Sequence, residues 1–527
     1  MKLEKDLKKR TNNQYALLSV FDKTGIVDLA KQLTSLGYQV ISTGGTAKVL
    51  AENGLLFTPV QEITGNPECF DGRMKTISFQ IESGILYDHA NPTHCQQAKE
   101  LKICPIKIVI CNLYPFEKTI QNPKVSFKEA IENIDVGGPT MIRAAAKNFL
   151  NVLVVVDPKD YPKFCSVLKD GKPSLTFHQK LAAKAFGHLS FYDSQIARFF
   201  SKEAFPKELT IPGRKVLHLR YGENPHQKAA FYLEPNTSSP LKNLQRISGR
   251  ELSLVNLTDI NAGLQSLQLF STPAAVVIKH NSPCGIALGK TPSQALDRAI
   301  KADPESAFGG VVVLNRKIDL AAAKIIAAFK SEQKSNIDIV AAPQIEPEAS
   351  ELLWLTRKTM GIYTFEKILP PKQTLNPKWV EGGFILQTPD RLQKKDFDNW
   401  EVATATKPLK KQLEQMKLGW QFISRIRSNA VIVVDQSLPM TRGIGSGQTS
   451  RFRSTQIALD QAREKAIGGI LVSDSFFPFS DSVRLAAKYK IGAIVQQGGS
   501  VNDQSSIKAA EKAGIPMVFT HKRAFWH

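Results

Sequence analysis

The hydrophobic pattern of the first part of the chain alternates between apolar runs and amphipathic segments. Residues 15–21 form an apolar run typical of a buried strand, and apolar positions then recur at helical spacing between residues 26 and 36. A second strand is expected at residues 38–42 and a second helix at residues 47–53. Strands that alternate with helices in this way predict a parallel sheet with right-handed crossovers, and therefore an α/β fold.

The apolar run at residues 274–278 ends in two ionisable side chains. It is continuous, which suits a strand covered on both faces, and Lys279 and His280 follow it directly. Turn-forming residues 281–285 come next, and Thr291-Pro292 is placed to open a helix. Ligands bind beyond the carboxyl ends of strands in open α/β sheets, so this pair is a candidate for charge stabilisation and proton transfer. A solvated lysine beside a hydrogen-bonded histidine is the alternative.

The C-terminal half contains a weak internal repeat. The motif ALDRA at residues 295–299 precedes a Gly-Gly pair and a strand at residues 311–314. The motif ALDQA at residues 458–462 precedes a second Gly-Gly pair and a strand at residues 470–472. A helix that ends in alanines follows each strand. The repeat predicts two similar α/β lobes with a ligand site between them.

A polar, proline-containing segment at residues 205–212 divides the chain. Such a segment is typical of a domain linker, so we expect one domain at residues 1–205 and another at residues 213–527. A chain of 527 residues is long enough for about two to four domains, each with its own core.

The net charge of +21 favours anionic partners. Lys and Arg residues are spread along the chain rather than gathered beside aromatic residues, so small anionic substrates explain the charge better than nucleic acid does. Residues 1–10 are charged and lack the apolar core of a signal peptide, and no run of about 18 apolar residues suggests a membrane span. We expect a loose basic tail on a cytoplasmic protein that binds neither nucleic acid nor a membrane.

The six cysteines are scattered, with no CxxC pair and no histidine at metal-ligand spacing. This pattern argues against a zinc site and against a disulfide framework. We therefore expect no metal.

Two loops of the first domain join a strand end to a helix start. They are DKTG at residues 22–25 and STGGT at residues 42–46. Backbone N–H groups at such a position attract an anion together with the helix dipole, and Lys23 adds charge to the first loop. A tight turn without a ligand is the alternative for each loop taken alone.

Further segments of this domain place charged and hydroxyl side chains at loops or helix ends. The set resembles the cyclohydrolase domain of the bifunctional AICAR transformylase/IMP cyclohydrolase family of purine biosynthesis. The matching segments are SVFDKTG (19–25), STGGTAK (42–48), DGRMKT (71–76), CNLYPF (111–116) and IENIDVGGPTMIRAAAKN (131–148). The resemblance implies a methylglyoxal-synthase-like parallel sheet that holds the nucleotide phosphate on its first two loops.

The resemblance also implies a reaction, in which the carboxamide nitrogen of formyl-AICAR attacks the formyl carbon, water leaves and IMP forms. Lys75 would stabilise the oxyanion. The residues that would orient the carboxamide and move protons are Tyr114, Asp135 and Lys147. The substrate would also contact Ser19, Lys23, Thr43, Gly45, Thr46, Arg73, Thr76, Asn112 and Gly137.

The segment after Lys75 departs from the family pattern. The family usually has Leu-His-Pro after the Lys-Thr pair and a second histidine shortly afterwards, whereas this chain has Ile77-Ser78-Phe79 and no histidine up to Glu82. If either histidine orders the loop that carries Lys75, ring closure is weakened. A working transformylase with an impaired cyclohydrolase domain is therefore the alternative within the family.

The second domain resembles the transformylase domain of the same family. The matching segments are RYGENPHQ (220–227), VIKHNSPCG (277–285), DPESAFGG (303–310), RSNA (427–430), GIGSGQTSR (443–451), SDSFFPFSD (473–481) and RAFWH (523–527). The resemblance implies two cytidine-deaminase-like α/β lobes and formyl transfer from 10-formyltetrahydrofolate to the amine of AICAR. His280 would accept the amine proton, and Lys279 would stabilise the oxyanion or protonate the departing folate nitrogen.

The remaining contacts of the transformylase follow from the same resemblance. AICAR would contact Arg220, Tyr221, Gly309, Asp338, Asn429, Arg523 and Phe525. The folate would contact Phe308, Arg451, Phe476 and Asp481, and Ser480 stands where the family usually has arginine. The family builds this site across a homodimer interface, so a homodimer is expected.

Two other classes of protein fit less well. A nucleic-acid-binding protein would explain the charge but not the order of the motifs. A zinc deaminase would need H-x-E and P-C-x-x-C ligand motifs, which the chain lacks.

Overall fold

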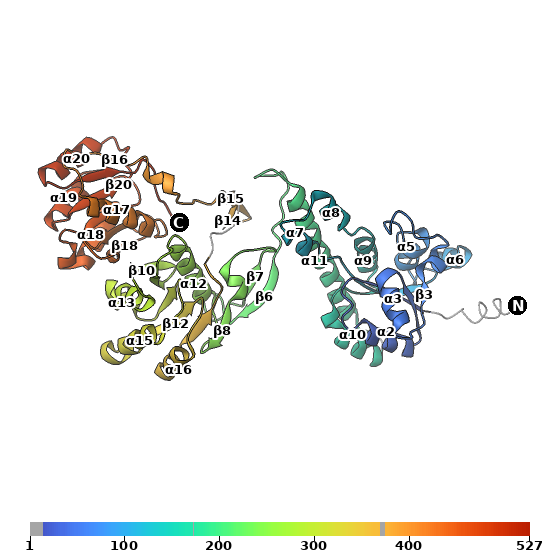
Figure 1. The fold of residues 1–527 in the computed structure, drawn as a ribbon. Helices are drawn as coiled ribbons and strands as arrows, with labels where there is room; N and C mark the ends of the chain where they lie inside the picture. The colour runs from blue at the N-terminus through green and yellow to red at the C-terminus, as the bar shows by residue number, and fades with distance from the viewer. Residues whose placement is uncertain (1–13, 172, 369–374) are drawn as a thin grey trace. The chain divides into compact units, whose positions relative to one another are not determined.

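The computed structural model describes residues 14–171, 173–368 and 375–527 (Figure 1). The chain forms two compact units, one containing the residues up to Arg214 with Glu234–Asn236, and the other containing Lys215–Leu233 with Thr237–His527. Residues 201–213, which include the predicted linker, form neither helix nor strand. The predicted basic tail at residues 1–10 lies outside the described residues, and the domain limits 1–205 and 213–527 stay predictions.

The first unit is a five-stranded sheet in the order β3-β2-β1-β4-β5, with every pair parallel. The strands are β1 (Gln14–Val20), β2 (Tyr38–Ser42), β3 (Thr58–Pro59), β4 (Ile106–Asn112) and β5 (Leu153–Val155). The helices are α2 (Ile26–Ser35), α3 (Gly44–Glu52), α4 (Val60–Thr64), α5 (Phe79–Leu86), α6 (Pro92–Glu100), α7 (Phe116–Gln121), α8 (Phe127–Glu132), α9 (Gly137–Lys147), α10 (Tyr161–Lys169) and α11 (Leu175–Phe200). The predicted parallel sheet is confirmed.

Alternating side chains of β1 enter two different cores. Tyr15 and Leu17 pack in the cluster that includes α9 and α11, while Ala16 and Leu18 pack in the cluster that includes α2 and α10. A strand covered on both faces has to be apolar at every position, which explains the continuous apolar run in the sequence. The carboxyl ends of β1, β2 and β4 therefore meet at one edge, where the loops of this unit carry its polar residues.

The second unit contains two lobes with the same strand order. The first sheet is β10-β9-β11-β12-β13-β8 and the second, taken in the same direction, is β18-β17-β19-β20-β21-β16. In the first sheet β12 is parallel to both β11 and β13, and in the second sheet β20 is parallel to both β19 and β21. All other neighbouring strands of the two sheets are antiparallel. The duplication predicted from the short repeat is confirmed.

The elements of the first lobe are β8 (Gln245–Ser248), α12 (Leu254–Leu267), β9 (Ala274–Lys279), β10 (Ser282–Leu288), α13 (Pro292–Ala302), α14 (Pro304–Ala307), β11 (Gly310–Leu314), α15 (Leu320–Gln333), β12 (Ile337–Ala342), α16 (Pro347–Thr356) and β13 (Gly361–Thr364). Those of the second are β16 (Glu401–Val402), α17 (Lys410–Ile423), β17 (Val431–Val434), β18 (Thr441–Gly445), α18 (Arg451–Ala462), β19 (Ile470–Ser473), α19 (Asp481–Lys488), β20 (Ala493–Gln496), α20 (Asp503–Lys512) and β21 (Met517–Phe519). Two hairpins, β6 (Arg214–Leu219) with β7 (Ala229–Leu233) and β14 (Asn376–Val380) with β15 (Gly383–Gln387), stand apart from the lobe sheets.

The two lobes share one hydrophobic core. Val276 and Ile278 of β9 pack in the same cluster as Ile432 and Val434 of β17 and as Trp420 of α17. The alternate residues of each sheet pack in separate outer clusters. The edge strands also meet, since the N–H of Ile286 in β10 donates to Thr441 Oγ1 in β18 at 3.1 Å. The lobes are therefore one folded body.

The structure corrects two predictions about local structure. Residues 281–285 were expected as a turn, but only His280 and Asn281 form the turn, and β10 begins at Ser282. Strand β9 is antiparallel to both of its neighbours, so Lys279 does not lie at a parallel edge. The glycine-containing motif at residues 443–451 is largely regular, because β18 extends to Gly445 and α18 begins at Arg451.

The glycines of β18 allow close packing of a helix rather than binding of a phosphate. A Cβ on Gly443 would lie 1.9 Å from the carbonyl oxygen of Ala458, and one on Gly445 would lie 1.9 Å from that of Ser454. Both carbonyls belong to α18, which therefore rests directly on the strand. Close approach of two backbones is a common reason for glycine inside a strand.

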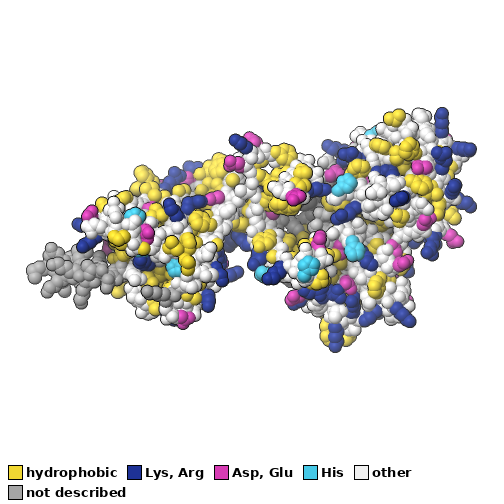
Figure 2. Space-filling view, turned by 180° about the vertical axis from the view of Figure 1, so that it is seen from behind, with side chains coloured by type: hydrophobic (Ala, Val, Ile, Leu, Met, Phe, Trp, Pro, Cys, Tyr) yellow, Lys and Arg dark blue, Asp and Glu magenta, His cyan; other side chains and the backbone are white. Residues whose placement is uncertain are grey.

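Two further observations concern the surface charge and the helices. On the face shown in Figure 2, Lys and Arg side chains are scattered among acidic and apolar ones rather than gathered in one patch. Among the residues that the structure describes, no helix is both long and apolar enough to cross a membrane.

Candidate functional sites

Two lysines converge on the N-terminus of α3 in the first unit. A Cβ on Gly45 would lie 3.4 Å from Lys23 Nζ, and one on Gly44 would lie 3.6 Å from Lys75 Nζ. The N-cap residue Thr43 makes no side-chain capping hydrogen bond. Its Oγ1 is buried and has no partner among the described residues, and the residue is only 4% exposed. Free N–H groups, a free hydroxyl and two ammonium groups together suit an anion.

Asp135 lies at the N-terminus of α9 and faces Lys75. Its Oδ1 accepts a hydrogen bond from the N–H of Gly138 at 2.9 Å, and its own N–H donates to Tyr192 Oη at 2.8 Å. Burial raises the pKa of the Asp135 carboxyl, while the N–H of Gly138, the charge of Lys75 and the N–H of Tyr114 act in the opposite direction. The backbone of Tyr114 is therefore part of the same cluster, and its ring packs on that of Phe21 at 5.2 Å.

Several predicted contact residues hold the loops in place. Asn112 Oδ1 accepts from the N–H groups of Phe21 and Asp22, both at 2.8 Å, and its Nδ2 donates to the carbonyl of Asp22. The hydroxyl of Thr46 bonds both the N–H and the carbonyl of Val20. These side chains fix the end of β1 against β4 and α3, so the anion-binding loops are built before any ligand arrives.

The other predicted residues of this unit lie at different distances from the cluster. Gly137 is tight against Thr76, since a Cβ there would lie 2.6 Å from Thr76 Oγ1. Arg73 is exposed and forms an ion pair with Glu132. Ser19 is half-buried near the end of β1. Lys147 is exposed at the far end of α9, roughly 15 Å along the helix from Gly137, so the structure does not bring it to Asp135.

The segment that departs from the family pattern begins a capped helix. Ser78 is the N-cap of α5, and its hydroxyl accepts from the N–H of Ile81 at 3.1 Å. Phe79 is the first residue of the helix and is exposed. Glu82 lies on the same helix, and its buried Oε1 has no partner among the described residues. Burial raises the pKa of Glu82 to about 7.

Lys279 and His280 occupy the end of β9 and the turn that follows. The ammonium group of Lys279 donates to the carbonyl oxygen of Phe308 at 2.9 Å. Gly309 and Gly310 allow this approach, since Gly309 has a φ of 72° and a Cβ on Gly310 would lie 2.9 Å from Val277 Cγ1. The ring of Phe308 is half exposed, so a flat aromatic surface lies beside the lysine.

Three predicted AICAR contacts of the first lobe have protein partners. The guanidinium of Arg220 lies over the Tyr221 ring at 4.7 Å and donates to its hydroxyl at 2.9 Å. The carboxylate of Asp338 accepts from Arg250 at 2.7 Å and from Arg357 at 2.6 Å. One carboxylate between two arginines leaves this part of the surface positive.

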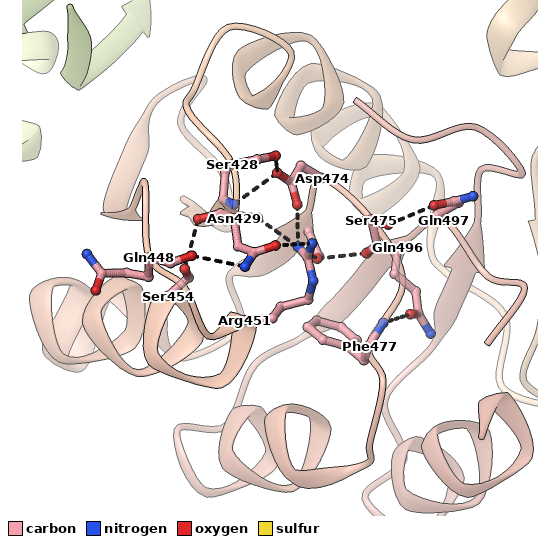
Figure 3. A network of polar contacts seen from close by, with 12 residues as sticks. Ser428, Asn429, Gln448, Arg451, Ser454, Asp474, Ser475, Phe477, Gln496 and Gln497 are labelled. Atoms are coloured by element: carbon pink, nitrogen blue, oxygen red, sulfur yellow. Dashed lines mark hydrogen bonds and ion pairs between the residues drawn. The ribbon is translucent and has the colours of Figure 1, made fainter. Parts of the chain in front are cut away.

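A buried ion pair organises the loops of the second lobe (Figure 3). Asp474 is fully buried and Arg451, at the start of α18, is 7% exposed; the two side chains form an ion pair. Arg451 also donates to Ser473 Oγ at 2.9 Å and to Asn429 Oδ1 at 2.8 Å. The other Asp474 oxygen accepts from the N–H of Ala430 at 3.0 Å and from the hydroxyl of Ser428.

This network orients the Asn429 amide. Its Oδ1 accepts from Arg451, while its Nδ2 donates to the carbonyl of Gln448 at 2.9 Å. The hydroxyl of Ser454 also donates to the Asn429 carbonyl at 2.8 Å. Because the amide oxygen accepts a hydrogen bond and the amide nitrogen donates one, the orientation of the Asn429 side chain is fixed. Arg451, which was predicted to contact folate, lies inside the protein and touches Asn429 instead of solvent.

The C-terminal residues pack against the same network. The N–H of Ala524 donates to the carbonyl of Asp474 at 2.8 Å, and the N–H of Ser428 donates to that of Trp526 at 2.9 Å. Arg523 lies over the ring of Phe525 at 4.7 Å. Arg523 and Phe525 therefore lie next to the segment that carries Asn429, and their contact with AICAR stays a prediction.

The phenylalanine-rich loop after β19 has one buried and several accessible rings. Phe477 is fully buried, and its N–H donates to Gln496 Oε1 at 2.7 Å. Phe476 is half-buried and Phe479 exposed. Asp481 begins α19 and its carboxylate bonds the N–H of Ser482. The buried ring anchors the loop and leaves Phe476 and Asp481 accessible.

Sequence reasoning missed the side chains that hold the predicted residues. Asp474 holds Arg451, Arg250 and Arg357 hold Asp338, and Asp259 accepts from the N–H of Asn281. Asp474 lies within a motif that was quoted for the resemblance, and no other signal marks it.

Among the described residues, no group of three or more His, Cys, Asp or Glu side chains could hold a metal ion.

Comparison with known proteins decides the family. Residues 25–140 match an MGS-like domain, and residues 145–461 match the AICARFT/IMPCHase bienzyme. The bifunctional purine biosynthesis protein PurH of Oceanobacillus iheyensis is 42% identical over 518 residues, which cover 97% of this chain and 99% of that protein. PurH of Lysinibacillus sphaericus is 44% identical over 514 residues with the same coverage. The chain belongs to this family of bifunctional purine biosynthesis enzymes.

The predicted family, the α/β fold with an MGS-like first domain, and the assignment as a bifunctional transferase and hydrolase are confirmed. These matches give no support to the alternative of a transformylase alone. Among solved structures, the crystal structure of ForH is 32% identical and covers 36% of this chain and 100% of its own, with a TM-score of 0.32.

Replacing Glu82 with glutamine should stabilise the first unit at high pH. The pKa of Glu82 is higher in the folded chain than its ordinary value of 4.5, so the fold favours the protonated acid. The native state is therefore fully stable below the ordinary value and loses stability as the pH rises through about 7. Glutamine stays neutral, so the temperature that halves cyclohydrolase activity should rise by a few degrees at about pH 8 and not at about pH 5.

Glu129→Gln is a control for which the opposite change in stability at high pH is expected. The hydroxyl and N–H of Ser126 lower the pKa of Glu129, so this substitution should lose stability at high pH. Equal effects of Glu82→Gln at the two pH values would contradict the role of burial.

Replacing Arg451 with lysine should impair the transformylase. Lysine keeps the charge opposite Asp474 but lacks the forked donors that reach Ser473 and Asn429. Loss of these buried hydrogen bonds should cost about 1–3 kcal/mol of stability in the second unit and lower formyl transfer, while cyclohydrolase activity is unchanged. Arg453→Lys, at an exposed position of the same helix, should leave both activities as they are.

Proposed function

We propose that the two activities of this bifunctional enzyme use the two sites separately. The first unit closes the ring of formyl-AICAR to give IMP, and the second unit transfers the formyl group of 10-formyltetrahydrofolate to AICAR. The observation that carries the assignment is the pair of ionisable clusters, Lys75 with Asp135 in one unit and Lys279 with His280 in the other.

In the cyclohydrolase, the nucleotide phosphate binds at the N-terminus of α3. The convergence of Lys23 and Lys75 on Gly44–Gly45 and the unpartnered hydroxyl of Thr43 support this placement. Lys75, whose charge also acts on Asp135, stabilises in this proposal the oxyanion that forms when the carboxamide nitrogen attacks the formyl carbon. Asp135 and Tyr114 accept and return the protons as the C–N bond forms and water leaves. The role of Lys147 stays a prediction.

In the transformylase, the AICAR amine attacks the formyl carbon, the new C–N bond forms, and the bond from that carbon to the folate nitrogen breaks. His280 accepts the amine proton. Lys279 neutralises the developing oxyanion and protonates the folate nitrogen as it departs. Phe308, whose carbonyl anchors Lys279, places a half-exposed ring where the folate heterocycle stacks, and Phe476 and Asp481 complete that pocket. No metal takes part in either step as proposed.

We further propose a homodimer in which each transformylase site uses Lys279 and His280 of one copy and Asn429, Arg523 and Phe525 of the other. The support for this sharing is the family resemblance, which implies a transformylase site built across a homodimer interface. A closed dimer gives two such shared sites. The cytoplasmic location stays a prediction.

The assignment of the two sites is tested by separate assays of the purified full-length chain. Lys75→Met should lower IMP formation from formyl-AICAR by at least about 100-fold and leave formyl transfer unchanged, because it removes the oxyanion partner. His280→Ala should lower formyl transfer by about 100-fold or more and leave ring closure unchanged. Conversion of formyl-AICAR by the Lys75→Met chain at the unmutated rate would refute the cyclohydrolase assignment.

Mixing two inactive variants tests the shared site. Chains with His280→Ala and chains with Arg523→Ala should each transfer formyl groups poorly. After subunit exchange, mixed dimers contain one intact site, so activity should recover to about a quarter of the unmutated value. A failure to recover, with exchange verified by native mass spectrometry, would show that each site belongs to a single copy.

A further inference from the structure

The turn that carries His280 has an unusual backbone. Lys279 pairs with Ser282 across β9 and β10, which leaves only His280 and Asn281 in the turn. Their φ values are 54° and 60°, both in the left-handed region. Two-residue hairpin turns of this kind favour Asn-Gly, because most side chains are disfavoured there. A histidine keeps this conformation only if neighbouring groups hold it.

Asp259 of α12 is the neighbour that holds the turn. Its carboxylate accepts a hydrogen bond from the N–H of Asn281 at 2.6 Å, and the residue is only 5% exposed. Burial raises the pKa of the Asp259 carboxyl, and the N–H of Asn281, the charge of His280 and the N–H of His280 act in the opposite direction. One carboxylate therefore contacts the backbone of both turn residues and lies near the His280 ring.

No other role explains this buried acid. Among the described residues, Asp259 forms no ion pair with a lysine or arginine, although Lys279 lies in the neighbouring strand. Cys284 lies nearby on β10, and burial raises the pKa of its thiol to about 12, so it is neutral at ordinary pH and adds no charge beside Asp259. A buried carboxylate is costly unless its hydrogen bonds are made, and here they are made to the turn.

We propose that Asp259 is a positioning residue of the transformylase, which holds the His280–Asn281 turn so that the His280 ring and the Lys279 ammonium group face the same substrate. The inference rests on the proposed function of His280. Asp259 does not touch the substrate; it acts through the backbone of the turn. Lys279 is held separately, by the carbonyl of Phe308. The positions of Lys279 and His280 are therefore fixed by two independent contacts.

The test compares Asp259→Ala, Asp259→Asn and the double variant Asp259→Ala/Asn281→Gly in the full-length chain. The Ala variant should lower kcat of formyl transfer by at least about tenfold and change KM for AICAR and for 10-formyltetrahydrofolate much less, because the loss affects the transition state. The Asn variant keeps an oxygen that accepts from Asn281 and should retain most of kcat. Glycine adopts the left-handed conformation without strain, so the double variant should recover part of the loss.

Two controls are built into the chain. Cyclohydrolase activity should stay unchanged in every variant, which shows that the first unit is intact, and the thermal unfolding transition of the second unit checks that this unit is folded as well. Asp319→Ala removes another carboxylate of the same lobe, which accepts from the N–H of Ala322 at 2.7 Å. Asp319 caps the start of α15 and does not bond the His280–Asn281 turn. It should leave kcat of formyl transfer within about twofold.

The outcomes separate the proposals. An Ala variant with kcat within twofold of the unmutated chain overturns the positioning role, as does an Asn variant as poor as the Ala variant, since the hydrogen bond alone should suffice. If the Ala variant does not fold, the Asn variant decides: retention of most of kcat supports the positioning role, and a loss of about tenfold or more overturns it, because Asn keeps an acceptor for the N–H of Asn281. Full formyl transfer by His280→Ala would instead overturn the proposed function, whatever the Asp259 variants do.

Discussion

A buried carboxylate must have its hydrogen bonds made inside the protein, and in this enzyme that requirement fixes the shape of the sites. Asp474 is the clearest case, since it is completely removed from solvent. Its two oxygens take donors from Arg451, Ser428 and the backbone of Ala430. These donors belong to the start of α18 and to the segment before β17, so one side chain brings both together. The C-terminal residues then dock on its carbonyl.

The same arrangement occurs at the other two sites. Asp135 takes the N–H of Gly138 where α9 begins, and Asp259 takes the N–H of Asn281 in the turn after β9. In each case the acid binds backbone donors of the segment that presents the candidate reactive groups, rather than a surface lysine. Directional bonds to the backbone leave little freedom to the loop, and catalysis depends on groups that are already in position when the substrate binds.

The sequence predicted the elements whose pattern is local and missed the contacts that join distant segments. The strands β1, β2 and β9 and the N-cap at Thr291 follow from neighbouring residues, and the structure has them. The direction of β9 could not be predicted, because a continuous apolar run suits a buried strand of either orientation. Gly443 and Gly445 belong to a motif that was quoted for the resemblance, and only the distance to the backbone of α18 shows why they are glycines. The burial of Arg451 depends on Asp474, which is remote along the chain, so no local pattern could indicate it.

The departure after Lys75 shows why a missing family residue need not mean a missing activity. What the loop needs is a fixed end, and a helix N-cap supplies one as well as a histidine would. The hydroxyl of Ser78 caps α5 directly after Thr76, which itself packs against Gly137 at the start of α9. Both neighbours of the Lys75 loop, α5 and α9, are therefore anchored by contacts within this chain. The separate cost is Glu82, whose buried Oε1 has no partner among the described residues, and that cost falls on stability at high pH rather than on the position of Lys75.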